Sequence, residues 1–197
     1  MEAVIIDSGG ANLASLQFAL ERLGARVSVS SDAGAIAAAP RVVLPGVGSA
    51  ADAMQRLRRS GVAQLLPALR QPVLGICLGM QLLFESSAEG TTECLGILPG
   101  TVDRLEAVPG RPVPHMGWNQ LTGLREDPLL AGIEPGEYFY FVHSYAVPAS
   151  GVTLAHVDYG HAISAVVGRG NFWGTQFHPE RSAAAGARLL GNFLGLN

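Results

Sequence analysis

The segment LGICLGMQLLFE (74–85) places Cys77 between Gly75 and Gly79, after an apolar run and before a helix-like stretch. This spacing is typical of a nucleophile elbow, a strained strand-to-helix turn on which side chains two positions away would collide with the backbone. Such a turn lifts the sulfur above a sheet and over a helix N-terminus, where N–H groups and the helix dipole favour the thiolate. We therefore predict that Cys77 is a catalytic nucleophile rather than a buried structural cysteine, and that the N–H of Leu78 stabilises an oxyanion.

A thiolate that attacks an acyl carbon needs a proton carrier, and the chain offers five candidates: His115, His143, His156, His161 and His178. In the extended segment GTQFHPE (174–180), residues two apart point to the same side, so Glu180 can hold the ring of His178. A carboxylate there fixes the tautomer and stabilises the imidazolium, which predicts a triad of Cys77, His178 and Glu180. His143 in YFVHSY is the second candidate, although no acid stands two residues away and its neighbours are aromatic.

A glycine-rich turn, LPGVGSAA (44–51), offers two interpretations. Its Gly-x-Gly-x-x-Ala spacing matches a dinucleotide fingerprint, but it does not follow the first strand and no acidic residue stands about 20 positions further on. We therefore favour backbone donors that complete an oxyanion hole with Leu78. The chain also has no lysine, which excludes Schiff-base, pyridoxal phosphate and Walker-type phosphate-loop chemistry. We predict no cofactor and no metal site.

Composition limits the remaining possibilities. The chain of 197 residues is 48% apolar, without a linker that would divide it, and we expect one domain over 1–197. A net charge of −3 with scattered arginines argues against a nucleic-acid partner. We find no signal peptide and no apolar stretch of about 20 residues, so we expect no membrane contact. Only two cysteines favour a reducing compartment, hence a cytoplasmic protein, and Cys94 in TTECLG is predicted to be structural.

The elements that would position these residues change in character along the chain. The first half alternates β-like runs at 3–7, 25–30, 41–45 and 72–76 with helical patterns, which is typical of βαβ units and a parallel sheet. The second half is a series of short strands, TVDRL, HMGWNQL, YFYFVHSYAV, TLAHVDY, ISAVV and NFWGTQF, closed by the helix ARLLGNFLGL. We predict an α/β protein with three α/β/α layers and a mostly parallel sheet, to which antiparallel strands are added late.

Together the motifs VIIDSGGANL, LPGVG, GICLGMQLLFESS, PHMGWN, YFVHSY and GTQFHPERS cover nearly the whole chain. The chain resembles the class I, triad-type glutamine amidotransferases, which implies their flavodoxin-like architecture. The elbow with FHPE is specific for that superfamily. The segments GMQLLFESS, HMGWN and VHSY resemble in particular the glutaminase subunits of imidazole glycerol phosphate synthase from histidine biosynthesis.

The resemblance implies roles for matching positions. Cys77 would attack the side-chain amide carbon of glutamine, His178 would protonate the departing ammonia, and water would hydrolyse the thioester. Oxyanion donors would come from Gly46, Val47, Gly48 and Leu78, and the glutamine pocket from Gln81, Ser144, Tyr145 and Pro179. The implied partner is a (β/α)₈-barrel cyclase subunit in a heterodimer, which receives ammonia directly and makes imidazole glycerol phosphate and an aminoimidazole carboxamide ribotide. Its interface would involve Asn12, Trp118 and Arg181.

The chain departs from the pattern of these relatives at four positions. Ser8 and Ala11 replace a tyrosine and a glycine, Ser144 replaces a common threonine, and Arg181 replaces a usual lysine, whose geometry differs. Three other hypotheses stay open: a glutaminase of another amidotransferase pathway, a cysteine hydrolase or chaperone-like protein with the same elbow, and a regulatory subunit with a vestigial site.

Overall fold

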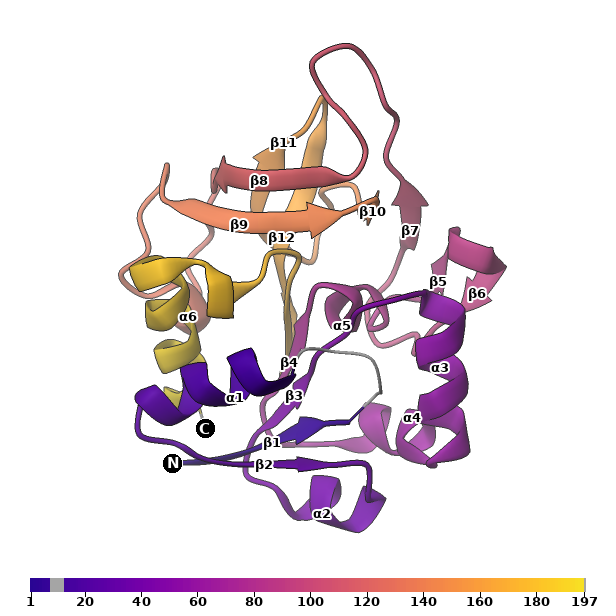
Figure 1. Ribbon diagram of the computed structural model, residues 1–197, viewed down its shortest axis with the longest axis vertical. Helices are drawn as coiled ribbons and strands as arrows, with labels where there is room; N and C mark the ends of the chain where they lie inside the picture. The colour runs from indigo at the N-terminus through magenta and orange to yellow at the C-terminus, as the bar shows by residue number, and fades with distance from the viewer. Residues whose placement is uncertain (8–12, 197) are drawn as a thin grey trace.

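The main sheet of the computed structural model, which describes residues 1–7 and 13–196, has seven strands in the order β11-β12-β13-β4-β3-β1-β2 (Figure 1). Five neighbours pair in parallel: β1 (Glu2–Ile6), β2 (Arg26–Ser30), β3 (Val42–Leu44), β4 (Val73–Ile76) and β13 (Phe172–Thr175). Two antiparallel strands, β12 (Ala162–Arg169) and β11 (Thr153–Asp158), extend the β13 edge. The parallel strands follow the 2-1-3-4-5 order of flavodoxin-like sheets. The predicted mostly parallel sheet with late antiparallel strands is confirmed.

Helices cover both faces of this sheet, which gives the three predicted layers. In Figure 1, α1 (Leu13–Arg22) and α6 (Ala183–Gly195) lie on one side and α3 (Ala50–Arg59) and α4 (Val62–Leu65) on the other. Two buried apolar clusters correspond to the two faces, one with side chains of α1 and α6, the other with α2 (Ala33–Ala38) and α3. None of the helices in the described part of the chain is long and apolar enough to span a bilayer.

Local sequence explains why these elements form where they do. The runs VVL of β3 and VLGI of β4 are buried along their whole length, as central parallel strands require. Helix α3 is capped at its N-terminus by Ser49, whose side chain accepts the N–H of Asp52, and its last turn carries three arginines that complement the helix dipole. These elements hold the ends of β3 and β4 side by side, where the two glycine-rich turns lie.

Most short strands of the second half form two smaller sheets outside the main one. One has the order β10-β7-β5-β6 and the other pairs β8 with β9. Their bounds are β5 (Ser86–Ser87), β6 (Thr92–Glu93), β7 (Thr101–Arg104), β8 (His115–Gln120), β9 (Tyr138–His143) and β10 (Tyr145–Ala146). The described residues also form four 3₁₀ turns: η1 (Leu66–Ala68), η2 (Glu89–Thr91), η3 (Pro128–Leu130) and η4 (Pro179–Arg181). The chain crosses from β9 to β10 directly above the end of β4 (Figure 1).

The helix after Cys77 is shorter than the sequence pattern predicts. We expected a helix through LGMQLLFE, whereas α5 spans only Leu78–Gln81. The carbonyls of Leu82, Leu83 and Phe84 accept N–H groups from the segment 95–98 instead of from the next helical turn. These tertiary hydrogen bonds end the helix after one turn, so its dipole is small and the charge partner of the Cys77 sulfur must come from elsewhere.

Candidate active site

Cys77 occupies a strained turn between β4 and α5, as the elbow pattern predicts. Its φ of 53° and ψ of −111° lie in a region that non-glycine residues avoid, at a cost of about 1–3 kcal/mol. A Cβ added at Gly75 would lie 2.7 Å from the carbonyl oxygen of Gly79, and one added at Gly79 would lie 1.8 Å from that of Leu44. Both flanking glycines are therefore required by close backbone approach, and the second one also packs the elbow against the end of β3.

Replacing Gly79 by alanine should destabilise the fold by about 3 kcal/mol or more, because the new methyl group meets backbone rather than a flexible side chain. Gly191→Ala is the matched control, since a Cβ at that position of α6 meets nothing within 4 Å. The control should stabilise the protein by about 0.5–1 kcal/mol through helix propensity. Urea unfolding of the two variants measures both changes, and equal stabilities would contradict the close approach at the elbow.

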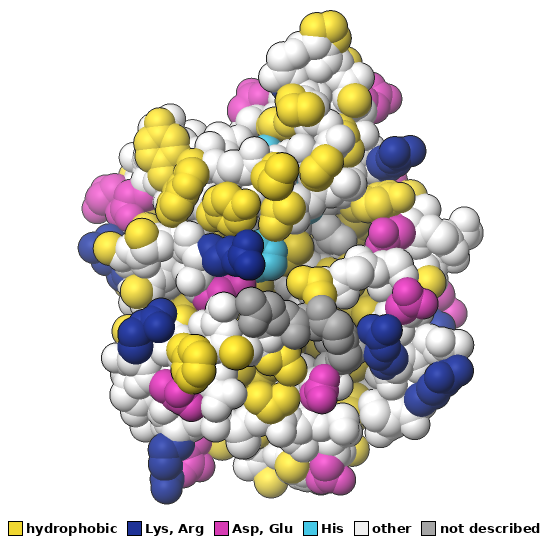
Figure 2. Space-filling model, viewed as in Figure 1, with side chains coloured by type: hydrophobic (Ala, Val, Ile, Leu, Met, Phe, Trp, Pro, Cys, Tyr) yellow, Lys and Arg dark blue, Asp and Glu magenta, His cyan; other side chains and the backbone are white. Residues whose placement is uncertain are grey.

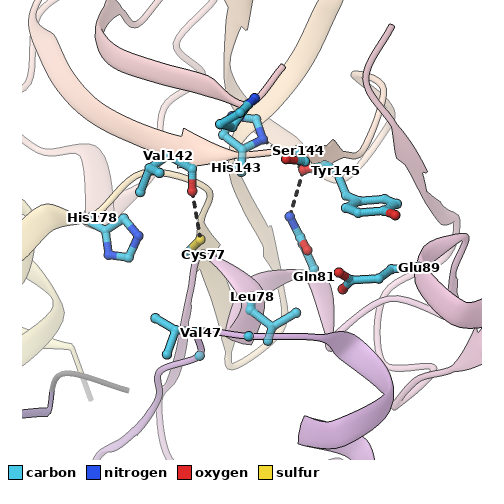
Figure 3. Close-up of a pocket in the computed structure, with 13 residues that line it drawn as sticks. Val47, Cys77, Leu78, Gln81, Glu89, Val142, His143, Ser144, Tyr145 and His178 are labelled. Atoms are coloured by element: carbon cyan, nitrogen blue, oxygen red, sulfur yellow. Dashed lines mark hydrogen bonds between the residues drawn. The ribbon is translucent and has the colours of Figure 1, made fainter. Parts of the chain in front are cut away.

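The predicted triad residues come together at the carboxyl ends of β4 and β13. His178 Nδ1 lies 2.8 Å from Glu180 Oε1, and Figure 3 shows the ring of His178 beside the Cys77 sulfur. Burial alone would lower the pKa of His178, but its hydrogen bonds with Cys77 and Glu180, and their charges, raise that pKa to about 10. The ring is thus held as an imidazolium next to the Cys77 sulfur, which makes His178 the cation that the short α5 cannot supply.

A cavity of about 410 Å³ opens above the Cys77 sulfur (Figure 3). Its wall includes all four residues predicted as oxyanion donors, Gly46, Val47, Gly48 and Leu78. A Cβ on Gly46 would lie 2.8 Å from the Leu78 Cβ, so the β3 turn and the elbow are in direct contact. As the first residue of α5, Leu78 has an N–H that no preceding helical turn can accept. The arrangement therefore supplies backbone donors close to the nucleophile.

Three of the four predicted glutamine-pocket residues also line this cavity: Gln81, Ser144 and Tyr145. The Gln81 amide donates to the Tyr145 carbonyl oxygen at 2.8 Å, which joins the elbow helix to the β9–β10 crossing. Pro179 does not reach the cavity wall. It is buried at the start of η4, and its carbonyl packs so closely on α6 that a Cβ on Gly186 would lie 2.0 Å away.

His143, the second candidate for the proton carrier, also lines the cavity but is already engaged. Its Nδ1 lies 2.8 Å from the Tyr145 carbonyl oxygen and its Nε2 lies 2.9 Å from His115 Nδ1. Burial lowers the pKa of His143 to about 3. A neutral ring with both nitrogens in hydrogen bonds is a poor general base, which leaves His178 as the better candidate.

The sequence patterns missed several polar residues of the site. Glu89 is the one carboxylate among the described residues of the cavity wall, and it lies eight positions beyond Gln81 with no local motif to mark it. Gln176 donates to the Cys77 sulfur at 3.8 Å, and its place two residues before His178 could have indicated it. No group of three or more histidine, cysteine or acidic residues in the described ranges is arranged to hold a metal ion.

The residues predicted for a partner interface lie beside the site. Trp118 on β8 is 52% exposed, and Met116 and Tyr138 on the same ribbon are exposed at 64% and 54%. Figure 2 shows the apolar side chains gathered over β8 and β9, with arginines beside them. The ring centroids of Trp118 and Tyr140 lie 6.0 Å apart. The backbone of Tyr140 is hydrogen-bonded to the backbone N–H of His178 and to the Ser182 hydroxyl, so this surface continues to Arg181 on η4. Asn12, Ser8 and Ala11 lie outside the described residues.

Comparison with known proteins agrees with this geometry. The family model "Glutamine amidotransferase class-I" matches residues 4–195. Among curated proteins, the "Imidazole glycerol phosphate synthase subunit HisH" of Xanthomonas euvesicatoria is 54% identical over 196 residues, which cover 100% of this chain and 98% of that protein. The subunit of the same name from Shewanella oneidensis is 52% identical, with 98% and 95% covered.

Solved structures of low sequence identity share the fold. A putative GMP synthase protein from Thermoplasma acidophilum superimposes with a TM-score of 0.76 at 18% identity, over 99% of this chain and 92% of that one. PurLQS from Thermotoga maritima gives a TM-score of 0.73 at 20% identity, over 98% and 97%. With the elbow, the Cys–His–Glu constellation and these full-length matches, the chain belongs to the class I glutamine amidotransferase family, and within it to the HisH subunits of imidazole glycerol phosphate synthase.

Proposed function

We propose that this chain hydrolyses glutamine to glutamate through a Cys77 thioester and delivers the ammonia to a (β/α)₈-barrel cyclase subunit that makes imidazole glycerol phosphate. The observation that carries the proposal is that Cys77 and His178 line one cavity, while Glu180 holds the other side of the His178 ring by a hydrogen bond of 2.8 Å. It is supported by 54% identity to a subunit of imidazole glycerol phosphate synthase along the full chain.

The geometry supports the following steps. The Cys77 thiolate attacks the amide carbon of glutamine, and the carbonyl oxygen becomes an oxyanion facing the N–H groups of Leu78 and the Gly46–Gly48 turn. The His178 imidazolium gives its proton to the amide nitrogen, the C–N bond breaks, and ammonia leaves a thioester. Water then attacks the thioester while His178 takes its proton, which returns glutamate and the Cys77–His178 ion pair.

Glu89 supplies the charge that a zwitterionic substrate needs. Its Oε2 accepts the N–H of Ala50 at 2.8 Å, which fixes the carboxylate at the cavity wall where it can receive the α-ammonium group of glutamine. We expect Glu89→Gln to raise the KM for glutamine about tenfold or more, because the amide keeps an acceptor for Ala50 but loses the charge. Steady-state kinetics measure this change.

Glu93→Gln is the control for Glu89→Gln. Glu93 is a nearby carboxylate whose side chain is 89% exposed, and its partner Arg58 lies 3.8 Å away on the surface. Removing its charge should leave KM unchanged. A KM that rises equally in both variants would mean that the pocket responds to net charge and not to Glu89 itself.

Direct delivery of ammonia explains why an exposed apolar surface lies beside the cavity. Ammonia released into neutral water becomes ammonium, which is no longer nucleophilic, so a sealed contact with the acceptor enzyme preserves its reactivity. An exposed patch of large apolar side chains is typical of a protein–protein interface. The surface formed by Met116, Trp118 and Tyr138 is the proposed cyclase contact.

Trp118→Ala should weaken the affinity for the cyclase by about 10–100-fold, as loss of a large aromatic anchor does at an interface centre. Isothermal titration of the cyclase into each variant gives the affinity directly. Val29→Ala provides the comparison, because Val29 is also exposed, at 39%, but lies on β2 at the opposite edge of the molecule (Figure 1). If both variants bind as the unaltered chain does, the contact surface lies elsewhere.

The proposal as a whole is tested by mixing the chain with the cyclase subunit of imidazole glycerol phosphate synthase. We expect a stable complex and glutamine turnover that rises when the cyclase carries its nucleotide substrate. Glutaminase activity without complex formation would assign the chain to another amidotransferase pathway. Failure to hydrolyse glutamine under any of these conditions would overturn the proposed activity.

A further inference from the structure

A buried pair of histidines lies outside the triad yet is connected to the glutamine pocket. His115 on β8 and His143 on β9 face each other across the two-stranded ribbon as register partners, with exposures of 4% and 6%. His115 Nδ1 lies 2.9 Å from His143 Nε2. Burial lowers the pKa of His115 to about 4 and that of His143 to about 3, so both rings are neutral near pH 7.

The hydrogen-bond partners at one end of the pair fix where its protons lie. The Nδ1 of His143 faces the Tyr145 carbonyl oxygen at 2.8 Å, and a carbonyl can only accept, so this nitrogen carries the proton. In a neutral ring the Nε2 of His143 is then an acceptor. It must receive its hydrogen bond from a proton on His115 Nδ1.

The contacts of His115, at the other end of the pair, independently give the same direction of hydrogen bonding. The side chain of Asn119 accepts the backbone N–H of Gln120 at 2.8 Å and donates to the carbonyl of Asp158 at 3.2 Å, which settles the orientation of its amide. Its Nδ2 therefore points an N–H at His115 Nε2, 3.3 Å away, and that nitrogen must be the acceptor. Both ends require each imidazole to carry its single proton on Nδ1.

The hydrogen-bonded series continues from the Tyr145 carbonyl into the pocket. Gln81 Nε2 donates to that same oxygen at 2.8 Å and to Gln176 Oε1 at 2.9 Å, so both of its N–H groups are used. What Gln81 presents to the cavity is therefore its Oε1, an acceptor. Because Gln176 accepts from Gln81, its own amide nitrogen faces the Cys77 sulfur, at 3.8 Å.

We propose that His115 and His143 are positioning residues for glutamine binding, which hold the Tyr145 carbonyl in place through a one-way series of hydrogen bonds and thereby orient Gln81. The hydrogen bonds of the two rings go to each other, to Asn119 and to the Tyr145 carbonyl, and not to Cys77 or His178. Their effect reaches the substrate through the wall of the cavity, to which both His143 and Gln81 belong. This inference rests on the proposed glutaminase activity.

Two substitutions of His115 separate hydrogen bonding from packing. The ring of His115 lies between those of Phe141 and Tyr159, at centroid distances of 4.9 and 4.1 Å. His115→Phe keeps an aromatic ring in that place but removes the donor to His143. His115→Asn loses the ring but keeps an N–H where Nδ1 stands.

In the complex with the cyclase, we expect His115→Phe to raise the KM for glutamine about tenfold with kcat within about threefold, and His115→Asn to stay within about threefold in KM. A packing role predicts the reverse order. His161→Phe, a change of the same kind at an exposed position, should leave both constants unchanged. An unchanged KM in folded His115→Phe, or equal impairment of both His115 variants, would overturn the proposal.

Nitrogen-15 NMR of the histidine rings in the unaltered complex gives a second readout that needs neither activity nor a foldable variant. We expect both His115 and His143 to be neutral and protonated on Nδ1 between pH 6 and about 8. A proton on Nε2 of either ring would rule out the one-way series. Because this result is independent of turnover, it separates failure of the inference from failure of the proposed glutaminase activity.

Discussion

Replacing Cys77 by alanine should abolish glutamine-dependent synthesis by the complex while leaving ammonia-dependent synthesis intact. Without the sulfur no thioester forms, and loss of a nucleophile from a catalytic triad lowers turnover by about four orders of magnitude or more. The partner's own site should still use ammonia supplied as a concentrated ammonium salt at alkaline pH. Product formation measured in parallel with glutamine and with ammonia gives the glutamine-dependent and the ammonia-dependent rate for the same preparation.

The control for this prediction is Cys94→Ala. Cys94 is also buried, and burial raises the pKa of its thiol to about 11, so it is not a thiolate near pH 7. Its variant should retain glutamine hydrolysis, and a reactive diazo-ketone analogue of glutamine should alkylate Cys77 alone. Residual glutaminase activity in Cys77→Ala, or labelling of Cys94, would show that the nucleophile has been misassigned.

The parts of the site that the sequence predicted are those encoded within a few neighbouring residues. The elbow could be predicted because its geometry demands glycine on both sides of Cys77, and the pairing of His178 with Glu180 because extended residues two apart share a face. The parallel sheet followed from strands that alternate with helices. For the elbow and the His178–Glu180 pair the physical requirement acts over a few residues, and for the sheet it acts through a pattern repeated along the first half of the chain.

The parts that the sequence missed depend on contacts between distant segments. Glu89 reaches the cavity because η2 packs against α3, and nothing near it in the sequence indicates a ligand. His115 and His143 meet only because β8 and β9 pair over a separation of 28 residues. The one-turn length of α5 is set by hydrogen bonds from residues 95–98, which override a good helical pattern. Pairings of this kind have no signature in a single sequence.

The turn around Val47 illustrates how local sequence patterns and contacts between distant segments together build the site. A glycine-rich turn after β3 could be predicted to offer N–H groups, but its contact with Leu78 is a property of neighbouring parallel strands. The strained Cys77 and this turn thus depend on each other for position. The same packing that requires Gly79 brings the oxyanion donors to the nucleophile, so stability and catalysis share one set of contacts.

Glu180→Gln should lower kcat for glutamine hydrolysis about 100-fold and move the alkaline limb of the pH profile to lower pH. In the unaltered chain, His178 Nδ1 lies 2.8 Å from Glu180 Oε1. The amide oxygen of a glutamine side chain at position 180 can still accept this hydrogen bond, so the variant removes the charge and largely keeps the geometry. The carboxylate helps to raise the pKa of His178 to about 10, and its loss must lower that pKa. His178 must be protonated to release ammonia, so activity should then fall at a lower pH than in the unaltered chain.

Glu137→Gln is the matched comparison, because Glu137 is also paired with a cation, Arg188 at 3.1 Å, but does not contact His178. Its pH profile should coincide with that of the unaltered complex from pH 6 to about 10. A Glu180→Gln profile that loses amplitude without moving its alkaline limb would mean that Glu180 orients the ring but does not hold its charge. The imidazolium charge would then depend on the Cys77 sulfur and not on Glu180.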